Sequence, residues 1–454
     1  MKTNGAGEPA PNDLVSESIT LEDLLDNGQG VGRINGLVAF VTGGLPGERV
    51  RIAIDAKKRS YVSAHVVAIE AESPDRVASM CPVFPLCGGC QVLHLRYEAQ
   101  LAWKRRLVAD ALTRLGGFHD PDVAPTVSAL ASHDQGYRNK VSLVPRFIKG
   151  AMRLGFYEAR SHRVVPIEHC PVLLPRLDEA VRSLVAFAND APQAFEGIRH
   201  VVARASATGP ELVVSFNGVK ANRALGELVD ELRKRMPHVT GLVSNWEPVS
   251  DNVLFGERSA TLWGTPSLQE RIAGATLRFG VASFFQVHSA VLELIAQHVL
   301  TALSGAQRVV DLYCGVGTFG VILGKRGIAS TGVEWFKPAV DEAVANAAAN
   351  AVVNAAFETA GASVAVAGER GRSLFEGASA VIVDPPRKGC EAGVLAVIAQ
   401  WRVPKVLYVS CNPATLARDA RLLCEGGYRM LRATPYDMFP HTGHVEAVAE
   451  FDLM

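Results

Sequence analysis

A cysteine at position 411 combines a reactive side chain with a place in the chain where α/β proteins bind ligands. Cys411 follows the apolar strand predicted over 405–409 and precedes a segment with helical spacing, 414–423. The carboxyl ends of strands in open α/β sheets face bound ligands, and a helix N-terminus favours the thiolate form of a nearby cysteine. Cys411 is therefore a candidate nucleophile. The alternative is a half-buried thiol that only packs against its neighbours.

A glycine-rich turn earlier in the chain has the composition of a nucleotide-binding loop. The predicted strand 308–312 runs into the turn 313–320, and glycines in such a turn let backbone amides approach a ligand closely. The next predicted strand ends at Glu334, whose carboxylate can accept two hydrogen bonds from ribose hydroxyls. Together the turn and the acid predict a cofactor that contains a nucleoside. A structural turn followed by an unrelated acid is the alternative.

A third strand end carries another carboxylate. The predicted strand 380–383 ends in Asp384, and the two prolines that follow it hold the turn open. Asp384 can then direct its carboxylate into the same crevice as Glu334 and Cys411. An NAD site would use its loops differently. A site for S-adenosylmethionine beside a target base explains why neighbouring strand ends carry both acids and a thiol.

These residues need a sheet that brings several strand ends together, and the second half of the chain predicts one. From Ser289 onward, apolar strands alternate regularly with helical segments. This alternation predicts an α/β fold with a doubly wound, Rossmann-like sheet that has helices on both faces. The expected strands are 308–312, 330–334, 380–383, 405–409, 429–436 and 445–451, and the expected helices include 289–303, 338–350 and 414–423.

The first half of the chain predicts two further domains. Short alternating strands within 16–74, separated by glycine-rich turns, predict a small OB-like β-barrel. Strands and helices follow each other less regularly over 75–280, which predicts a central α+β domain. A flexible tail is expected over 1–15, and the doubly wound domain over 281–454. The expected barrel strands are 19–21, 31–34, 37–41, 49–55 and 61–69; the central strands are 140–144, 155–157, 212–216 and 241–244, with helices at 93–115, 175–188 and 221–235.

Composition limits the class of protein. The 454 residues carry 46 basic and 46 acidic side chains, so the formal net charge of zero gives no bulk attraction to nucleic acid. Between Leu101 and Cys170, however, eleven Lys or Arg stand against six acids, which indicates an RNA-binding face or an ordinary solvated surface. No run of eighteen apolar residues occurs, and the polar N-terminus lacks the apolar core of a signal peptide. We therefore expect a cytoplasmic protein that does not enter a membrane.

Four of the eight cysteines lie in the first half of the chain and have the spacing of ligands. Cys81, Cys87 and Cys90 are separated by five and two residues, and Cys170 follows far downstream beside Pro171. In a cytosolic chain such cysteines indicate metal binding rather than disulfides, and four thiolates can hold zinc or an iron–sulfur cluster. Zinc ribbons usually show two close pairs. Three clustered cysteines with one remote partner near a proline favour a cluster.

Six motifs, in order along the chain, closely resemble those of bacterial RNA uracil-5-methyltransferases. The resemblance extends from the barrel, which is similar to the TRAM domain of that family, almost to the last residue. It implies S-adenosylmethionine as the methyl donor and RNA as the substrate. The motifs are SFFQVH (283–288), DLYCGVGTFG (311–320), GVE (332–334), DPPRKG (384–389), VSCNPATLARD (409–419) and DMFPHTGHVE (437–446).

The resemblance implies covalent activation of the uracil ring. Uracil C5 is too weak a nucleophile to accept a methyl group directly, and attack of the Cys411 thiolate on C6 would make C5 nucleophilic. The base implied to remove the C5 proton afterwards is Glu446. Considered from the residues alone, His441 and His444 stay open as alternative bases.

The chain offers other thiols besides Cys411. Cys390 follows a glycine near a possible helix start, where its pKa could be lowered. It lies outside the motifs of the resembled family, so we interpret it as a small packing residue. Cys314 and Cys424 are interpreted in the same way.

The resemblance also assigns the residues that bind S-adenosylmethionine. Thr318 departs from the asparagine often found after the second glycine, which puts one contact in doubt. The segment 357–372 lacks the clear acid or amide expected near the adenine. The residues implied to line or shape the site are Gln286, Tyr313, Glu334, Asp384, Asp311, Gly315, Gly317 and Thr318.

The ribosomal RNA branch of the resembled family carries a 4Fe-4S cluster at the early cysteine pattern. The matching stretch 154–173 supports Cys170 as the fourth ligand beside Cys81, Cys87 and Cys90. Because methyl transfer needs no electron, the cluster is expected to be structural.

The cysteine pattern favours ribosomal RNA, 23S RNA above all, as the partner of a monomeric enzyme. The target uridine must leave its stack, so a loop or unfolded segment is expected. Tyr137, Arg138, Asn139 and Lys140 are expected to grip phosphates and stack bases. The alternatives are a transfer RNA uracil methyltransferase, a non-catalytic RNA-binding assembly factor, and an adenine or cytosine methyltransferase that would leave Cys411 idle.

Overall fold

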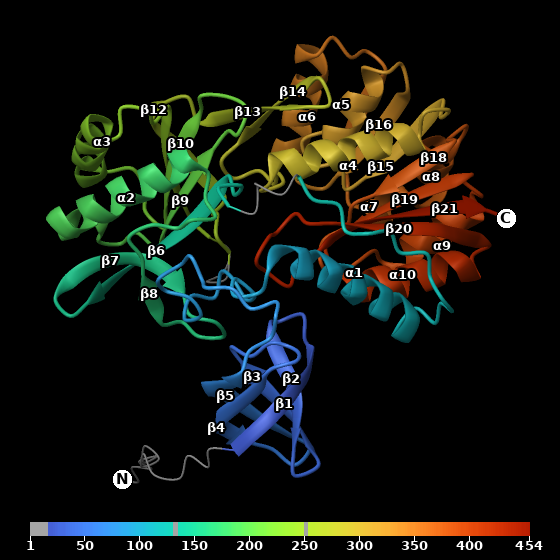
Figure 1. Ribbon diagram of the computed structural model, residues 1–454. Helices are drawn as coiled ribbons and strands as arrows, with labels where there is room; N and C mark the ends of the chain where they lie inside the picture. Colours follow the sequence, from blue (N-terminus) through green and yellow to red (C-terminus); the bar gives the residue numbers. More distant parts are fainter. Residues whose placement is uncertain (1–16, 130–134, 249–252) are drawn as a thin grey trace, which may run out of the picture. The chain divides into compact units, whose positions relative to one another are not determined.

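The computed structural model describes residues 17–129, 135–248 and 253–454 (Figure 1). The tail predicted over 1–15 lies outside these ranges. The chain folds into two compact units. One contains the barrel together with Cys90–Ala99 and His441–Gly443, and the other contains Cys81–Gly89, Gln100–Pro440 and His444–Met454.

The first unit contains a closed five-stranded barrel, which confirms the all-β prediction for this part of the chain. The strand order is β1-β2-β3-β5-β4, and β1 pairs with β4 to close the barrel. Ile19, Leu21 and Val50 alternate with exposed side chains along their strands and fill the interior. The strands are β1 (Glu17–Leu24), β2 (Gln29–Ile34), β3 (Leu37–Thr42), β4 (Arg49–Lys57) and β5 (Tyr61–Ala71).

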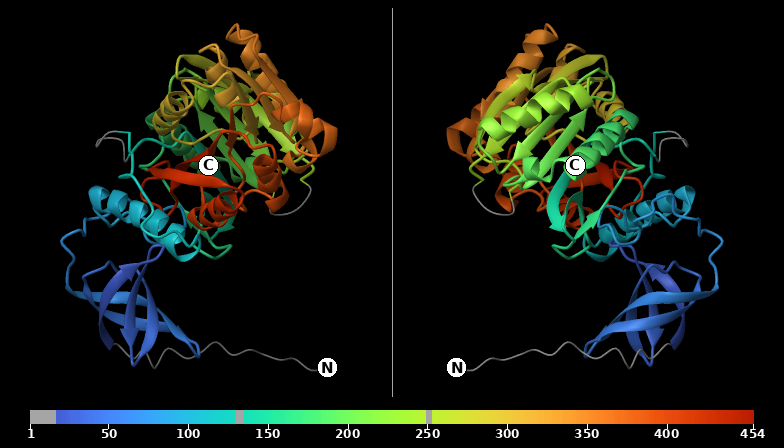
Figure 2. Two further views of the ribbon diagram at one scale, coloured as in Figure 1. Left: turned by 90° about the vertical axis from the view of Figure 1, so that its right-hand side faces the viewer. Right: turned by 90° about the vertical axis from the view of Figure 1, so that its left-hand side faces the viewer.

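The second unit contains two large sheets, and the central one has the order β12-β11-β10-β9-β6-β7-β8. Helices α2 and α3 cover one of its faces (Figure 2), where Leu184 and Leu228 share a core with Val214. The prediction missed β9, which carries the buried charge of Arg204 next to its last residue. The elements are β6 (Lys140–Ile148), β7 (Ala151–Tyr157), β8 (Val164–Pro166), α2 (Pro175–Asp190), η1 (Pro192–Phe195), β9 (His200–Ala205), β10 (Leu212–Asn217), α3 (Arg223–Arg235), β11 (Gly241–Trp246) and β12 (Arg258–Gly264).

The C-terminal sheet is doubly wound, as predicted, with the order β17-β16-β15-β18-β19-β21-β20. Helices α4 to α6 pack on one face and α7 to α10 on the other (Figure 1). The elements are α4 (Ser289–Ala302), β15 (Arg308–Leu312), α5 (Thr318–Gly324), β16 (Ala329–Glu334), α6 (Lys337–Ala349), β17 (Ala355–Thr359), α7 (Ala362–Ala365), α8 (Gly368–Phe375), β18 (Ala380–Val383), α9 (Ala392–Gln400), β19 (Lys405–Ser410), α10 (Pro413–Glu425), β20 (Tyr428–Tyr436) and β21 (Glu446–Leu453).

Two elements that fall within the range predicted for the central domain contact the C-terminal sheet instead. Helix α1 (Tyr97–Arg114) places Val108 and Leu112 in the core on the α7–α10 side of that sheet. The hairpin of β13 (Ser267–Ile272) and β14 (Ala275–Gly280) is tied to α6, because the Arg278 amide donates to Asn346 Oδ1 at 2.7 Å. An apolar helix face and a polar side chain of α6, rather than chain order, decide where these elements pack.

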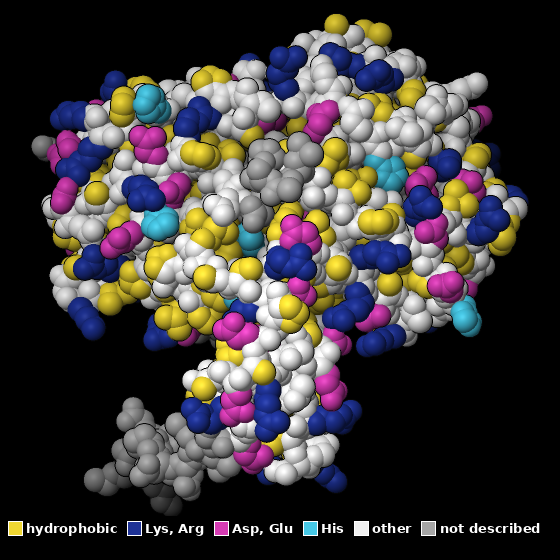
Figure 3. Space-filling model, in the orientation of Figure 1, with side chains coloured by type: hydrophobic (Ala, Val, Ile, Leu, Met, Phe, Trp, Pro, Cys, Tyr) yellow, Lys and Arg dark blue, Asp and Glu magenta, His cyan; other side chains and the backbone are white. Residues whose placement is uncertain are grey.

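Basic and acidic side chains are interspersed on the face drawn in Figure 3. Part of the basic excess over 101–170 does not lie on the surface at all. Lys104, for example, is fully buried and pairs with Asp437 at 2.5 Å. In the parts of the chain that the structure describes, no helix is long and apolar enough to cross a membrane.

Candidate active site

Five of the predicted site residues lie at one edge of the C-terminal sheet. Glu334 ends β16, Tyr313 follows β15, Asp384 follows β18 and Cys411 follows β19. Because β21 runs antiparallel to β19, Glu446 at the start of β21 reaches the same edge. The strand order places the two cofactor candidates of β15 and β16 on one side, the nucleophile and base candidates on the other, and Asp384 between them.

The register of β19 and β21 aligns the proposed nucleophile with the proposed base. Val409 pairs with Val448, and Ser410 pairs with Ala447, so the next positions along are 411 and 446. Val409 and Val448 both lie in the core beside α4. Because side chains alternate along a strand, the residues two positions further along each strand project toward that same face.

The turn after β15 has a conformation that requires glycine. Gly315 and Gly317 have φ of +53° and +80°, and a Cβ on Gly317 would lie 2.8 Å from the Ala343 Cβ. The Gly315 amide donates to Glu334 Oε2 at 3.3 Å. The carboxylate that was predicted to bind ribose is therefore fixed against the glycine-rich turn.

A pocket of about 500 Å³, counted with its part open to solvent, lies beside this turn. Five of the predicted cofactor residues line it: Gln286, Tyr313, Gly315, Thr318 and Asp384. Of the other three, Glu334 contacts the lining through Gly315, whereas Asp311 and Gly317 are buried behind it. The motif analysis did not assign the apolar residues that line the pocket, although the motif SFFQVH contains some of them. These apolar lining residues are Phe284, Phe285, Leu292, Ile295, Val316, Phe319 and Val409.

Burial and neighbouring carboxylates hold protons on the site residues. Burial, the charge of Glu446 and the charge of Asp384 raise the pKa of Cys411 to about 12, and Arg387 opposes them. The expected thiolate next to the helix N-terminus is therefore wrong for the free protein, because burial and two carboxylates outweigh the helix. Burial and the charge of Glu334 raise the pKa of Asp384 to about 7.

The other two carboxyl groups of the site share this environment. Burial raises the pKa of Glu446 well above its ordinary range, and the charge of Asp384 adds to the effect. Burial raises the pKa of Asp311 in the same way, with a further contribution from Asp384. A cluster of carboxyls that keeps protons near neutral pH can give and take a proton during a reaction.

Comparisons with known proteins identify the family. A model described as tRNA (Uracil-5-)-methyltransferase matches residues 268–450, and a TRAM domain model matches 17–67. Over 452 residues the chain is 35% identical to an uncharacterized RNA methyltransferase of Halalkalibacterium halodurans, which covers 97% of each chain. The chain belongs to the S-adenosylmethionine-dependent RNA (uracil-5-)-methyltransferases. This confirms the predicted reaction class, the methyl donor and the TRAM barrel.

Other similar proteins cover this methyltransferase over nearly its whole length. An uncharacterized RNA methyltransferase of Listeria innocua is 36% identical over 448 residues, covering 96% of this chain and 98% of the relative. The crystal structure of Pyrococcus abyssi tRNA (uracil-54, C5)-methyltransferase in complex with S-adenosyl-L-homocysteine has a TM-score of 0.73 and 28% identity. It covers 96% of this chain and 99% of that one.

The loop 283–288 of the methyltransferase, which carries three lining residues of the pocket, is held by the central sheet. Arg204 is fully buried and donates to the carbonyls of Ser283 and Phe285, both at 2.8 Å. Asn139 Nδ2 donates to the Gln286 carbonyl at 3.0 Å. The predicted site therefore depends on Arg204 of β9 and on Asn139, which directly precedes β6. The motif analysis assigned neither residue to cofactor binding.

The prediction that residues 137–140 form an RNA-gripping surface is wrong for Tyr137 and Asn139, and for the half-buried Arg138 and Lys140 it stays a prediction. Tyr137 and Asn139 are buried, and the Tyr137 hydroxyl donates to the Pro440 carbonyl at 3.1 Å. Arg138 Nε donates to the Lys140 carbonyl at 3.0 Å, and the Lys140 ammonium lies 5.3 Å from the centre of the Phe255 ring. The polar groups named here contact other protein atoms, next to the loop 283–288.

The two histidines weighed as alternative bases make other contacts. His444 is exposed, and its Nδ1 lies 3.0 Å from Arg387 Nη2. The carbonyl of His441 accepts hydrogen bonds from the amides of Gln91 and Val92 in the unit that contains the barrel. Glu446 is the candidate base that the sheet register aligns with position 411.

The early cysteines do not form a closed ligand set. Burial, with smaller contributions from Cys87 and Cys81, raises the pKa of Cys170 to about 12, so these three thiols share one environment. The Gly89 amide donates to Cys87 Sγ at 3.4 Å. Among the residues that the structure describes, no three Cys, His, Asp or Glu side chains converge closely enough to hold a metal ion.

Proposed function

We propose that this methyltransferase modifies C5 of a uridine in ribosomal RNA with Cys411 as the nucleophile and Glu446 as the base. The observation that carries the proposal is the β19–β21 register, which continues from the pair Ser410–Ala447 to positions 411 and 446 at the edge that holds the pocket. Bound in this pocket, S-adenosylmethionine supplies the methyl group.

The residues act in sequence on the uracil ring. The partly exposed Cys411 thiol first loses its proton to water. The thiolate then adds to C6, and the electron pair of the C5–C6 double bond moves toward C5 and makes it nucleophilic. After C5 has gained the methyl group, Glu446 takes the proton from C5. The electrons of that C–H bond restore the C5–C6 double bond, and the bond from Cys411 to C6 breaks. Asp384 borders the cofactor pocket, and its charge adds to the effect of burial in raising the pKa of both Cys411 and Glu446.

Ribosomal RNA is proposed over transfer RNA because of the cysteines at positions 81, 87, 90 and 170. We propose that they hold a structural 4Fe-4S cluster. Thiolates are the ligands that such clusters use, and Cys81, Cys87 and Cys170 share one environment. Cys90 enters the proposal through its sequence spacing alone. Protein purified without oxygen should be coloured and contain iron, whereas colourless protein that contains zinc would overturn the cluster.

Transfer RNA is the second candidate, because the similar Pyrococcus abyssi enzyme is a tRNA (uracil-54, C5)-methyltransferase. Nucleoside mass spectrometry of separated ribosomal and transfer RNA from a deletion strain distinguishes the two. We expect loss of 5-methyluridine from one fragment of 23S RNA and an unchanged level in transfer RNA. Loss from transfer RNA alone would overturn the ribosomal assignment.

A further inference from the structure

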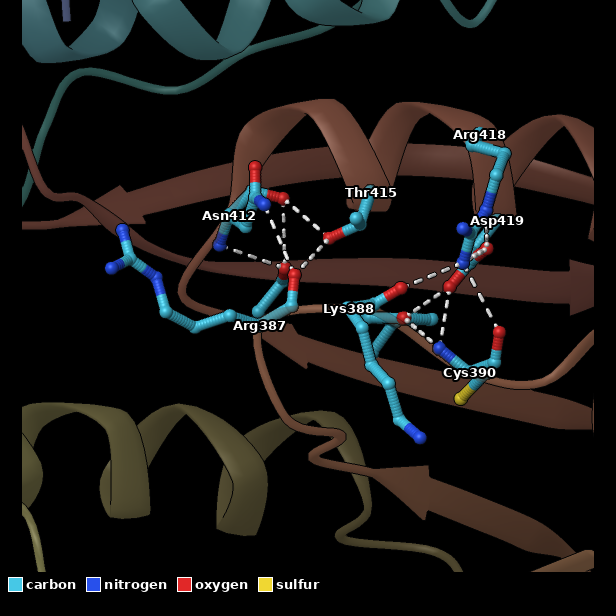
Figure 4. Close-up of polar contacts among 9 residues, drawn as sticks. Arg387, Lys388, Cys390, Asn412, Thr415, Arg418 and Asp419 are labelled. Atoms are coloured by element: carbon cyan, nitrogen blue, oxygen red, sulfur yellow. Dashed lines mark hydrogen bonds and ion pairs between the residues drawn. The ribbon is translucent and has the colours of Figure 1, made fainter. Parts of the chain in front are cut away.

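The loop after β18 is held from outside by the helix that follows the nucleophile (Figure 4). Asn412, the N-cap of α10, donates from Nδ2 to the Arg387 carbonyl at 3.0 Å. One turn further along, Thr415 Oγ1 donates to the same carbonyl at 3.4 Å. The backbone of Arg387 is therefore fixed to the helix that begins directly after Cys411.

The next turn of α10 holds the end of the loop with an ion pair between a buried aspartate and a partly exposed arginine (Figure 4). Asp419 is fully buried, and its Oδ2 accepts from the Cys390 amide at 2.8 Å and from the Tyr408 hydroxyl at 2.5 Å. Its Oδ1 accepts from Arg418 Nε at 2.7 Å. Arg418 Nη2 then donates to the carbonyls of Lys388 and Cys390, both at 3.1 Å. The pair thus satisfies three backbone groups of the loop.

The loop approaches this pair so closely that position 389 must be glycine. Gly389 has φ of +79°, and a Cβ there would lie 2.5 Å from Arg418 Nη2 and 2.7 Å from Asp419 Oδ2. The Gly389 amide also donates to the Pro386 carbonyl at 2.8 Å, which closes a tight turn. The contacts with α10 therefore also restrict the position of the segment that contains the two prolines.

Both ends of the loop bear on the cofactor pocket. At one end, the two prolines join the turn to Asp384, which lines the pocket, and their fixed φ limits the freedom of the connection. At the other end, the buried Cys390 belongs to the apolar cluster against which Tyr313, which also lines the pocket, packs. Asp419 touches neither of these lining residues, but it holds the segment between them.

We propose that Asp419, together with Arg418, is a positioning residue for the methyl-donor pocket, which it serves by fixing the loop 384–390 against α10. The pair keeps Asp384 and Tyr313 in place relative to Cys411, because the nucleophile immediately precedes the helix that carries the pair. This inference rests on the proposed assignment of the pocket to S-adenosylmethionine.

The test is calorimetric binding of S-adenosylmethionine to the full-length methyltransferase and to its Asp419→Asn variant. The amide keeps the size of the carboxylate but loses the charge that pairs with Arg418, so we expect the Kd to rise about tenfold, or about 1.4 kcal/mol. The KM for S-adenosylmethionine should rise by a similar factor while kcat at saturation changes less. Glu425→Gln, in an exposed pair at the end of the same helix, is the matched control and should bind as wild type does.

A gentler pair of variants keeps the test decisive if Asp419→Asn fails to fold. Cys390→Ser keeps the size of the buried side chain near Tyr313 and should bind almost normally, whereas the larger, branched side chain of Cys390→Val should displace the end of the loop and weaken binding several-fold. Equal binding by wild type, Asp419→Asn and Cys390→Val would overturn the positioning role. So would an equal loss of RNA affinity and cofactor affinity in a folded Asp419→Asn. Failure of the wild type itself to bind would instead overturn the assignment of the pocket.

Discussion

Two loops of this methyltransferase line the same pocket, but they are held in different ways. The loop 283–288 is held by Arg204 and Asn139, which lie 79 and 147 positions before the carbonyls they bind. The loop 384–390 is held by α10, whose side chains follow the bound groups by 25 to 30 positions. One wall of the pocket thus depends on a different sheet, and the other depends on the next strand and helix of the same sheet.

The difference has an energetic side. The charge of Arg204 is fully buried, and its partners include two carbonyls and the ring of Phe279 at 4.6 Å. The loop 384–390 is instead held by an ion pair whose arginine side chain is 44% exposed. Solvent can replace part of the second set of contacts, but not the first. We therefore expect the loop 283–288 to be more sensitive to single substitutions.

The largest effect should follow from Arg204→Met. Methionine keeps much of the packing but leaves the carbonyls of Ser283 and Phe285 without a donor, at about 1 to 3 kcal/mol each. S-adenosylmethionine affinity measured by calorimetry should fall by more than about thirtyfold, or about 2 kcal/mol. Arg308→Met is the control, because Arg308 also donates to a backbone carbonyl, that of Glu376, at the opposite end of β15. If Arg204→Met bound S-adenosylmethionine with wild-type affinity, the expected difference in sensitivity between the two loops would be contradicted.

The second largest effect is a pH dependence of S-adenosylmethionine affinity that arises in the loop 384–390. Asp384 belongs to the second loop and has its pKa raised to about 7 by burial and by Glu334. Its carboxylate forms as pH rises through that value and then attracts the positive sulfonium of S-adenosylmethionine. Affinity should increase by up to about tenfold between about pH 6 and 8.

Two comparisons check this pH dependence. S-adenosylhomocysteine has an uncharged sulfur, so its affinity should change little over the same range. Asp384→Asn should flatten the profile for S-adenosylmethionine. Equal pH profiles for both ligands would show that Asp384 does not face the sulfonium.

A smaller effect is expected from Asn139→Ala, because Asn139 is one of the residues that hold the loop 283–288. The substitution removes the 3.0 Å hydrogen bond to the Gln286 carbonyl but leaves Arg204 in place. The loss of about 1 kcal/mol should raise the KM for S-adenosylmethionine about fivefold in a methylation assay. If RNA affinity fell instead while this KM stayed constant, the original interpretation of Asn139 as an RNA-binding residue would return.

The smallest effect should come from Thr415→Val in the second loop's support. The hydroxyl donates to the Arg387 carbonyl at 3.4 Å, and Asn412 donates to the same atom at 3.0 Å. Because the carbonyl keeps its better donor, KM and kcat should change less than about twofold. A large loss in Thr415→Val would mean that the second loop is as sensitive as the first.

The same contrast explains how far the sequence could be interpreted. Strands β15 and β18 match their predicted bounds, and the acids and thiol that follow such strands lie at one sheet edge. This part was predictable because strand periodicity and the positions of strand ends are local properties. The motif VSCNPATLARD even contains Asp419, although no role for it was predicted.

The parts that could not be predicted depend on contacts between distant segments. Nothing in the pattern around Arg204 or Asn139 shows which loop they support. The residues 137–140 carry the composition of an RNA-binding surface, but their neighbours in space bury Tyr137 and Asn139. The raised pKa of Cys411 could not be predicted for the same reason, since it depends on burial and on the charges of Glu446 and Asp384 rather than on the adjacent helix.

The measurement that tests the central claim most directly is covalent trapping of the RNA. In Glu446→Gln the C5 proton has no base, so the bond from the nucleophile to C6 should persist. A protein–RNA adduct should accumulate with S-adenosylmethionine present, resist denaturation, and map by mass spectrometry to Cys411. The double variant Cys411→Ala/Glu446→Gln should form none. An adduct at Cys390 would contradict the assignment of nucleophile and base. So would normal turnover by Glu446→Gln or by Cys411→Ala.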